Sequence, residues 1–424
     1  MYSRHEGIKV GKDENGIFFV IQFTPDFTDK VYMNEFFEDC IESETEIDLK
    51  IEPHTKPRRR SEAFYDRLDP KERERIKKDL DLRSFYSPVR DDLNVYNYLM
   101  NVYKNNPPSM QYNAKSIMEH KEWANRLVKK VKELVGYPLE DVPMQVEEGP
   151  ETEFKNLVLK KYYITTAKYL KVPAILARPK KIDKKLPGII CVHGHNKGKI
   201  NTVGMEESSS NSYYGMDLAL RGNYVTLSLD QWGWGERRGQ NIKLEDKPEE
   251  VFAKSALLLG FTAIGIRSWE VTKSIDFLEQ FDFVDNKFGV IGQSGGGTTA
   301  AFSSVLEPRI NATVISGYFC SWLQSIFAMN HCSCNFIPGI LKYADLPDII
   351  ATRAPKPTFI VAGEYDPIFP KKGVLSGYEL LKEVYSLYSK QENLDIDIVP
   401  NVGHVFRGTY AYPWLDKVFG LNSK

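Results

Sequence analysis

A chain of 424 residues, 42% apolar and 27% charged, has the composition of a globular protein with one large domain and an appendage, or with two domains. The formal net charge of -1 excludes the global basic field that attracts nucleic acid or anionic membranes. The N-terminus lacks a signal-peptide layout, no window holds 18 uninterrupted apolar residues, and the five cysteines are an odd number, so we expect a soluble, cytoplasmic protein without a disulfide scaffold.

Residues 1–150 are rich in charged segments and predict a largely helical extension. Its clearest helix covers 116–138, where Ser116 is followed three residues later by Glu119, the spacing of a capping box. An apolar stripe recurs at helical intervals and predicts a face that packs on the main domain: Trp123, Leu127, Val131 and Leu134. Two roles for the extension stay open, a cap over the substrate pocket and an element of homo-oligomerisation.

From residue 151 to 424, apolar strand-like runs alternate with helical segments. The later runs are rich in Ile and Val without polar alternation, which is typical of parallel strands buried on both faces. The pattern predicts an α/β fold with a mostly parallel central sheet flanked by helices. Functional sites of such sheets lie at the carboxyl ends of the strands.

One candidate nucleophile follows the strand run that ends near residue 292. Gly292, Gln293, Ser294, Gly295 and Gly296 match G-x-S-x-G, in which the glycines let the chain turn sharply and expose the serine hydroxyl. The same glycines suggest a phosphate-binding loop as an alternative. That alternative is weaker, because the sequence has neither a G-x-x-x-x-G-K-[ST] motif nor an acidic partner at the expected offset.

A serine hydroxyl needs a base, and the base needs an orienting acid. Asp366 and His404 each come just after a later strand run, and they give the chain order Ser, Asp, His. Glu364 is the rival acid. We prefer Asp366, because Pro367 and a second proline three residues later would stiffen a protruding loop.

The oxyanion of a tetrahedral intermediate needs hydrogen-bond donors. Gly295 supplies one backbone N–H, and the loop 191–199 supplies the second, for which His195 is the first choice and Asn196 the next. The side chains of His193 and His195 also suggest a metal site. Without a third ligand at recognisable spacing, loop shaping and substrate contact are the preferred roles.

Two further segments bear on specificity. In 230–240, Trp232 and Trp234 either line a pocket and Arg237 binds an anionic or carbonyl group, or these residues only fold a tight loop. Residues 320–352 form a lid-like insertion whose apolar side chains suit a pocket wall. Three residues of that insertion resemble a fragment of a zinc site, but a closed site needs four ligands, so we predict packing and no metal: His331, Cys332 and Cys334.

Taken together, "VHGHNKGK", "LALRGNYVTLSLDQWGWGER", "GVIGQSGGGTTA", "GEYDPIFP" and "NVGH" resemble the α/β-hydrolase superfamily, in its branch of dienelactone hydrolases and acetyl xylan esterases. The resemblance covers roughly 155–422. It implies a catalytic triad of Ser294, Asp366 and His404, oxyanion donors at Gly295 and His195, and no cofactor.

The implied reaction is hydrolysis of a small carboxylic ester with a short acyl group, such as acetyl. Because this fold serves many chemistries, two alternatives stay open: cleavage of a carbon–carbon, thioester or amide bond, and a catalytically silent binding protein. The residues that we expect to contact substrate are His193, Asn196, Gln293, Trp232, Trp234, Arg237 and His331.

Overall fold

The computed structural model describes residues 8–13, 16–21, 69–71, 91–205, 212–239 and 247–421. By their contacts the residues form two units, Met1–Tyr98 and Leu99–Lys424, so this division precedes the predicted boundary at residue 150. In the first unit, β1 (Ile8–Asp13) and β2 (Gly16–Ile21) form an antiparallel pair. The rest of the predicted helical extension before residue 91 lies outside the described residues, apart from 69–71. The helix α4 (Val95–Asn105) has no buried residue.

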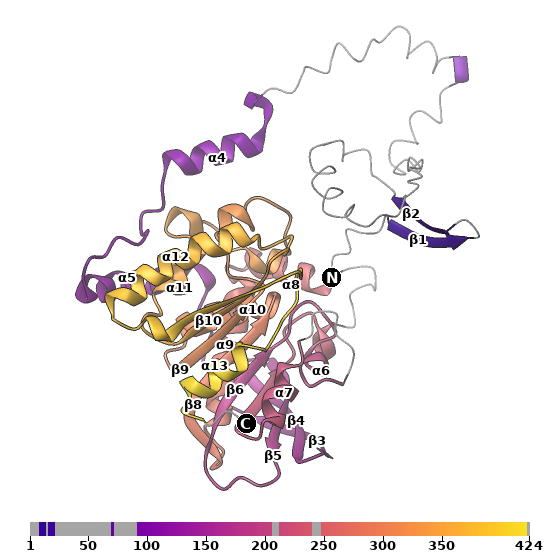
Figure 1. Cartoon of the computed structure of the whole chain (residues 1–424), viewed down its shortest axis with the longest axis vertical. Coiled ribbons are helices and arrows are strands. Elements are labelled where there is room, and N and C mark those ends of the chain that lie inside the picture. Colours follow the sequence, from indigo (N-terminus) through magenta and orange to yellow (C-terminus); the bar gives the residue numbers. More distant parts are fainter. Residues whose placement is uncertain are drawn as a thin grey trace. The chain divides into compact units, whose positions relative to one another are not determined.

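The second unit is built on a nine-stranded sheet in the order β11-β10-β9-β8-β6-β7-β5-β4-β3 (Figure 1). Its strands are β3 (Val146–Phe154), β4 (Leu157–Ala167), β5 (Leu170–Pro179), β6 (Leu186–Val192), β7 (Val225–Leu229), β8 (Val284–Gln293), β9 (Ile310–Ser316), β10 (Thr358–Gly363) and β11 (Leu394–Val399). Along the sheet, neighbouring strands from β7 through β6, β8, β9 and β10 to β11 pair in parallel. On the other side of β7, the pairs β7-β5, β5-β4 and β4-β3 are antiparallel. The predicted mostly parallel sheet is therefore confirmed.

The sequence did not predict β3. Its residues are mostly exposed and four of its nine are glutamates, so the strand lacks the apolar run that marks the other strands. Charged side chains are a common feature of edge strands, because they discourage further pairing.

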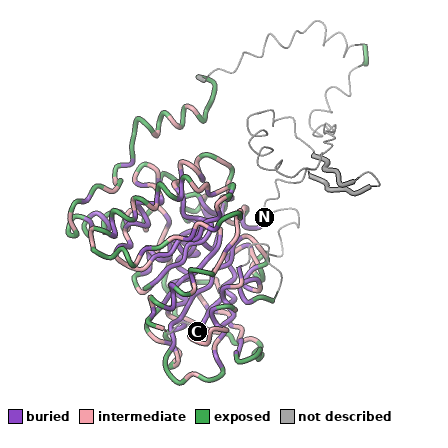
Figure 2. The backbone as a smooth tube through the Cα atoms, in the orientation of Figure 1, coloured by how far each residue is buried: buried purple, intermediate pink, exposed green. Residues whose placement is uncertain are grey.

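Side chains of the parallel strands alternate between two apolar cores. In β6, Ile190 and Val192 pack with one core, whereas Ile189 and Cys191 pack with another. This is why the apolar runs show no polar alternation: both faces of the sheet are covered. Figure 2 shows the central strands of the sheet largely buried and the outer helix surfaces exposed.

Helices cover both faces of this sheet (Figure 1). Residues of α7 (Tyr214–Leu220) and α13 (Ala411–Val418) pack on one face. The core on the other face includes residues of α5 (Ile117–Val135), α9 (Ala263–Leu278), α10 (Gly295–Leu306), α11 (Leu346–Ala351) and α12 (Lys371–Leu387). Two further helices, α6 (Lys199–Thr202) and α8 (Pro248–Leu258), lie in the connections that follow β6 and β7.

The predicted helix after Ser116 is α5. The Ser116 hydroxyl accepts a hydrogen bond from Glu119 N (3.2 Å), which confirms Ser116 as the N-cap. The Glu119 carboxylate accepts from Lys115 N (2.9 Å), one residue before the position that a capping box requires. Trp123, Leu127 and Val131 are buried in the main core, and Leu134 packs against it partly buried, so the stripe packs as predicted.

The insertion between β9 and β10 contains three single-turn helices, η4 (Trp322–Gln324), η5 (Ser333–Asn335) and η6 (Ile340–Lys342), followed by α11. Apolar side chains such as Trp322, Ile337 and Ile340 are buried in the main core. In the part of the chain that the structure describes, no single helix has the length and apolarity to cross a membrane. Among the described helices, one pair, α8 with α9, meets that test of length and composition together, with a 99° bend between them.

Candidate active site

Ser294 occupies the sharp turn between β8 and α10. Its backbone has a positive φ (φ 58, ψ -121), a conformation that a residue other than glycine rarely adopts. A Cβ on Gly292 would lie 2.1 Å from Gly296 O, and a Cβ on Gly296 would lie 1.9 Å from Val192 O. The two glycines of G-x-S-x-G are therefore required by close backbone packing on either side of the serine.

Asp366 and His404 meet at the ends of β10 and β11. His404 Nδ1 lies 2.6 Å from Asp366 Oδ2, and Asp366 Oδ1 accepts from the backbone N–H groups of Ile368 (3.0 Å) and Phe369 (3.1 Å). The Asp366 side chain is buried, so it fixes the imidazole from inside the protein. Because a carboxylate oxygen accepts, His404 Nδ1 carries the proton and Nε2 is the basic nitrogen. Nε2 is buried and makes no hydrogen bond to any described residue.

Two glycines show how closely the segments converge on Ser294. Ser294 N donates to Ser316 O (2.9 Å), and a Cβ on the next residue, Gly317, would lie 3.0 Å from His404 Cε1. A Cβ on Gly194, in the loop after β6, would lie 3.1 Å from Ser294 Cβ. The ends of β6, β8, β9 and β11 thus surround the serine, as expected for the carboxyl edge of a parallel sheet.

Glu364, the rival acid, lies in a different environment. Its carboxylate is 2.8 Å from Lys371 Nζ and accepts from Asn401 N (3.2 Å). The hydrogen bond from Lys371 lowers the pKa of Glu364. Among the described contacts, the carboxylate that lies within hydrogen-bond distance of the His404 ring is that of Asp366.

His193 lies inside the loop after β6 and is fully buried. Its Nε2 accepts from Gln231 N (2.9 Å) and its Nδ1 donates to Gly194 O (2.6 Å). Burial lowers the pKa of His193 to about 4, so the imidazole is neutral near pH 7. These hydrogen bonds hold the loop after β6, and substrate contact by His193 stays a prediction.

The side chain of His195 lies over the start of α10. A Cβ on Gly295 would lie 2.9 Å from His195 Nε2, and the ring stacks on Trp234 with centroids 5.4 Å apart. Nε2 also lies 2.6 Å from Glu249 Oε1. Burial alone would lower the pKa of His195, but the charge of Glu249 and the nearby Cys334 outweigh burial and raise it to about 10.

Contacts within the protein involve all three candidate residues of the 230–240 loop: Trp232, Trp234 and Arg237. Arg237 forms a two-pronged ion pair with Glu270 (2.9 and 2.6 Å) and donates to Asp230 O (3.1 Å), so its guanidinium holds the loop. Trp234 Nε1 donates to Glu249 Oε2 (3.0 Å), and the Trp232 ring lies 5.8 Å from the Arg267 guanidinium.

Three further residues were expected to contact substrate: Gln293, Asn196 and His331. Gln293 is buried, and its side-chain oxygen accepts from the Ser316 hydroxyl. The Asn196 side-chain oxygen accepts from Gly198 N (3.1 Å). His331 Nε2 lies 3.1 Å from the Ser325 hydroxyl, and its ring lies 5.2 Å from that of Phe369, which in turn stacks on His404.

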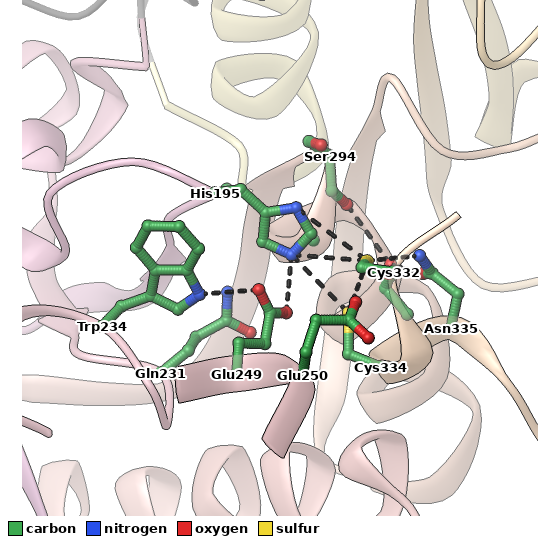
Figure 3. Close-up of polar contacts among 12 residues, drawn as sticks. His195, Gln231, Trp234, Glu249, Glu250, Ser294, Cys332, Cys334 and Asn335 are labelled. Carbon is green, nitrogen blue, oxygen red and sulfur yellow. Dashed lines mark hydrogen bonds and ion pairs between the residues drawn. The ribbon is translucent and has the colours of Figure 1, made fainter. Parts of the chain in front are cut away.

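The sequence-based reading grouped His331 with Cys332 and Cys334, but the structure gives these cysteines other partners (Figure 3). The ligand atoms of His195, Glu249, Cys332 and Cys334 all lie within 4.8 Å of one another. Glu249 was not singled out from the sequence, because it is 54 residues from His195 in no recognised motif. The sequence signal that could have indicated this cluster was the presence of His193 and His195 in one loop and of Cys332 and Cys334 in another.

The chain matches the Abhydrolase family over residues 90–399. It belongs to this family. A Bacillus subtilis (strain 168) protein named "Putative hydrolase YtaP" is 26% identical over 269 residues, which are 61% of this chain and 84% of the relative. With the strand order described above, membership of the Abhydrolase family confirms the predicted α/β-hydrolase fold.

Solved structures similar to this member of the Abhydrolase family include proteins titled as esterases. One titled as a putative acetyl xylan esterase, from Bacteroides fragilis NCTC 9343, has a TM-score of 0.66 and 17% identity, covering 78% of this chain and 97% of its own. The glucuronoyl esterase from Solibacter usitatus has a TM-score of 0.55 and 14% identity, covering 74% and 96%. At these identities, the likeness establishes a shared fold.

Proposed function

We propose that the protein is a serine hydrolase that cleaves a carboxylic ester through an acyl-enzyme on Ser294. The observation that carries the proposal is the imidazole of His404. Buried Asp366 holds its Nδ1 at 2.6 Å, while Nε2 is left as the acceptor at the strand edge where Ser294 stands on its strained turn. This is the arrangement that a base needs to remove a proton from a serine hydroxyl.

In the proposed reaction, Ser294 Oγ attacks the ester carbonyl while His404 Nε2 takes the hydroxyl proton. Asp366 keeps the imidazole in the required tautomer and stabilises its charged form. His404 then gives the proton to the leaving alcohol. Water activated by the same Nε2 attacks the acyl-enzyme, releases the acid and restores Ser294.

The oxyanion would be held by two backbone N–H groups. Gly295 is the first residue of α10, so its N–H is one of the four at a helix start that have no partner within the helix. The positive end of the helix dipole favours the same negative charge. The backbone N–H of His195 is the proposed second donor, because Gly194 brings that loop against Ser294. One such donor contributes about 2.7–4 kcal/mol to lowering the barrier.

The proposed substrate class is a small ester with a short acyl group. Support comes from the similar structures, which are named as acetyl xylan and glucuronoyl esterases, and from the sequence resemblance to the same branch. Turnover of p-nitrophenyl esters of increasing acyl length tests this, and a preference for octanoate over acetate would contradict it. Parallel assays with amide and thioester analogues test the alternative bond types.

The decisive experiment replaces the nucleophile. Ser294→Ala should lower kcat for p-nitrophenyl acetate by at least about 10³-fold, because attack on the carbonyl requires the hydroxyl. A fluorophosphonate probe should label the wild type and not the variant. Ser325→Ala is a matched control, since its hydroxyl bonds Ile368 O and His331 near the site yet should keep probe labelling. Full turnover by Ser294→Ala would refute the mechanism, and no turnover or labelling of wild type would favour a silent binding protein.

A further inference from the structure

Four side chains from three separate segments converge beside the start of α10 (Figure 3). His195 follows β6, Glu249 lies in the first turn of α8, and Cys332 and Cys334 flank the start of η5 in the insertion between β9 and β10. Glu249 and both cysteines are buried, and the His195 side chain is only 15% exposed. Their ligand atoms lie within 4.8 Å of one another.

The distances are those of side chains arranged around a common centre. His195 Nε2 lies 2.6 Å from Glu249 Oε1 and 3.6 Å from each of Cys332 Sγ and Cys334 Sγ, and the two sulfurs are 2.9 Å apart. Tetrahedral zinc binds nitrogen and oxygen at about 2.0–2.2 Å and sulfur at about 2.3 Å, which separates ligand atoms by roughly 3.3–3.8 Å. Shifts of less than about an ångström would therefore admit the ion.

Further polar groups orient these four side chains. Trp234 Nε1 donates to Glu249 Oε2 (3.0 Å), Arg267 donates to Glu249 Oε1 (2.9 Å), and the Asn335 amide donates to Cys332 Sγ (2.9 Å). Partners of this kind commonly fix the ligands of protein metal sites. The Asn335 bond also suits a thiolate, because an anionic sulfur accepts more strongly than a thiol.

The charges of the ligands and of Arg267 indicate which ion the site would bind. Arg267 is 1% exposed and brings one positive charge against Glu249. Two thiolates and one carboxylate carry three negative charges, which a divalent cation and the Arg267 guanidinium balance. Sulfur together with imidazole nitrogen favours zinc over magnesium or calcium, which prefer oxygen ligands.

We infer that His195, Glu249, Cys332 and Cys334 bind one Zn²⁺ in a closed, four-ligand structural site next to the nucleophile turn. This revises the sequence-based prediction of no metal. Four protein ligands leave no open position for a reacting water, so the ion's role is to tie the His195 loop, α8 and the insertion together. His195 belongs to both the ion site and the loop at Gly295, and the site thereby fixes the loop that faces the serine.

The test measures metal in the full-length protein, purified under reducing conditions without chelators. Plasma mass spectrometry should find about one zinc per chain, the content of one closed site. Cys332→Ser and Cys334→Ser should each lose most of it. Cys191→Ala is the matched control, because this buried cysteine lies in β6 outside the cluster, and it should keep the zinc of wild type.

A second measurement covers the case in which the cysteine variants do not fold. Wild type stripped of zinc and titrated with Co²⁺ should develop thiolate-to-cobalt charge-transfer absorption, which requires sulfur ligands. Wild type that holds no zinc and gives no such band would overturn the inference. So would a thiol count showing Cys332 and Cys334 joined as a disulfide, or zinc retained in both cysteine variants. None of these measurements uses turnover, so they fail or succeed independently of the proposed esterase activity.

Discussion

The set of Ser294, Asp366 and His404 and the neighbouring cluster of possible metal ligands are assembled in different ways. Ser294, Asp366 and His404 each follow a strand of the parallel sheet, within a few residues of its end. The His195–Glu249–Cys332–Cys334 cluster instead joins a loop, a helix start and an insertion. Strand order brings the first set together wherever the sheet forms, whereas the second set depends on how particular connections pack over it. Activity at the first set should therefore depend on the functional groups of its own side chains. Metal binding at the second should depend on the hydrogen bonds that hold its loops in place.

The largest effect should come from breaking the acid–base pair. Asp366→Asn should lower kcat by about 10³- to 10⁴-fold, because an amide N–H facing His404 Nδ1 favours the tautomer in which Nε2 cannot accept the serine proton. Steady-state kinetics on p-nitrophenyl acetate measures this.

Glu364→Gln is the matched control for that variant. Glu364 lies two residues away but pairs with Lys371, so its substitution should change kcat by less than about tenfold, as expected for a group outside the proton path. A larger loss in Glu364→Gln than in Asp366→Asn would reassign the acid.

A smaller and more selective effect should come from removing a hydrogen bond that orients a ligand of the proposed zinc site. Trp234→Phe keeps the ring stacked on His195 but removes the Nε1 donor to Glu249 Oε2. Zinc affinity, measured by competition with a chelator, should fall about 10- to 100-fold, the usual cost of losing an outer partner. Trp232→Phe is the natural comparison, because Trp232 Nε1 makes no hydrogen bond to the described residues. Equal affinities in the two variants would remove Glu249 from the ligand set.

The smallest effect should lie away from both clusters, where α5 packs on the core. His120 is buried between Tyr388 Oη (2.7 Å) and Ala351 O (3.1 Å), and burial lowers its pKa below the usual 6.5. The unfolded chain therefore takes up the proton first, so this residue's contribution to the free energy of unfolding is lost as pH falls below about 6.5.

His120→Gln should flatten that dependence while lowering stability at neutral pH, through the loss of a buried hydrogen bond, by about 1–3 kcal/mol. Thermal unfolding of wild type and variant across the range from about pH 7.5 to pH 5.5 tests the sign. Turnover at neutral pH should stay within about twofold, because α5 carries no member of the proposed triad. An identical slope of Tm with pH in both proteins would contradict the assignment to His120.

Prediction from the sequence succeeded where local patterns control structure. The unbroken Ile and Val runs gave the parallel strands, and the Ser116-to-Glu119 spacing gave the start of α5. It missed β3, whose glutamates hide an edge strand, and it missed Glu249, whose significance comes only from its neighbours in space. Arg237 shows the same limit, because its ion pair with Glu270 depends on where α9 lies.

By itself, the sequence determined the strand-helix alternation, the serine turn and the order of the candidate triad, because each depends on residues close together or on the order of strands. Only the tertiary structure decided which carboxylate meets His404, and which residues surround the two cysteines of the insertion. The physical reason is that hydrogen bonds and metal ligands act over about 2–4 Å in space. Along the chain, those partners are separated by tens to more than a hundred residues.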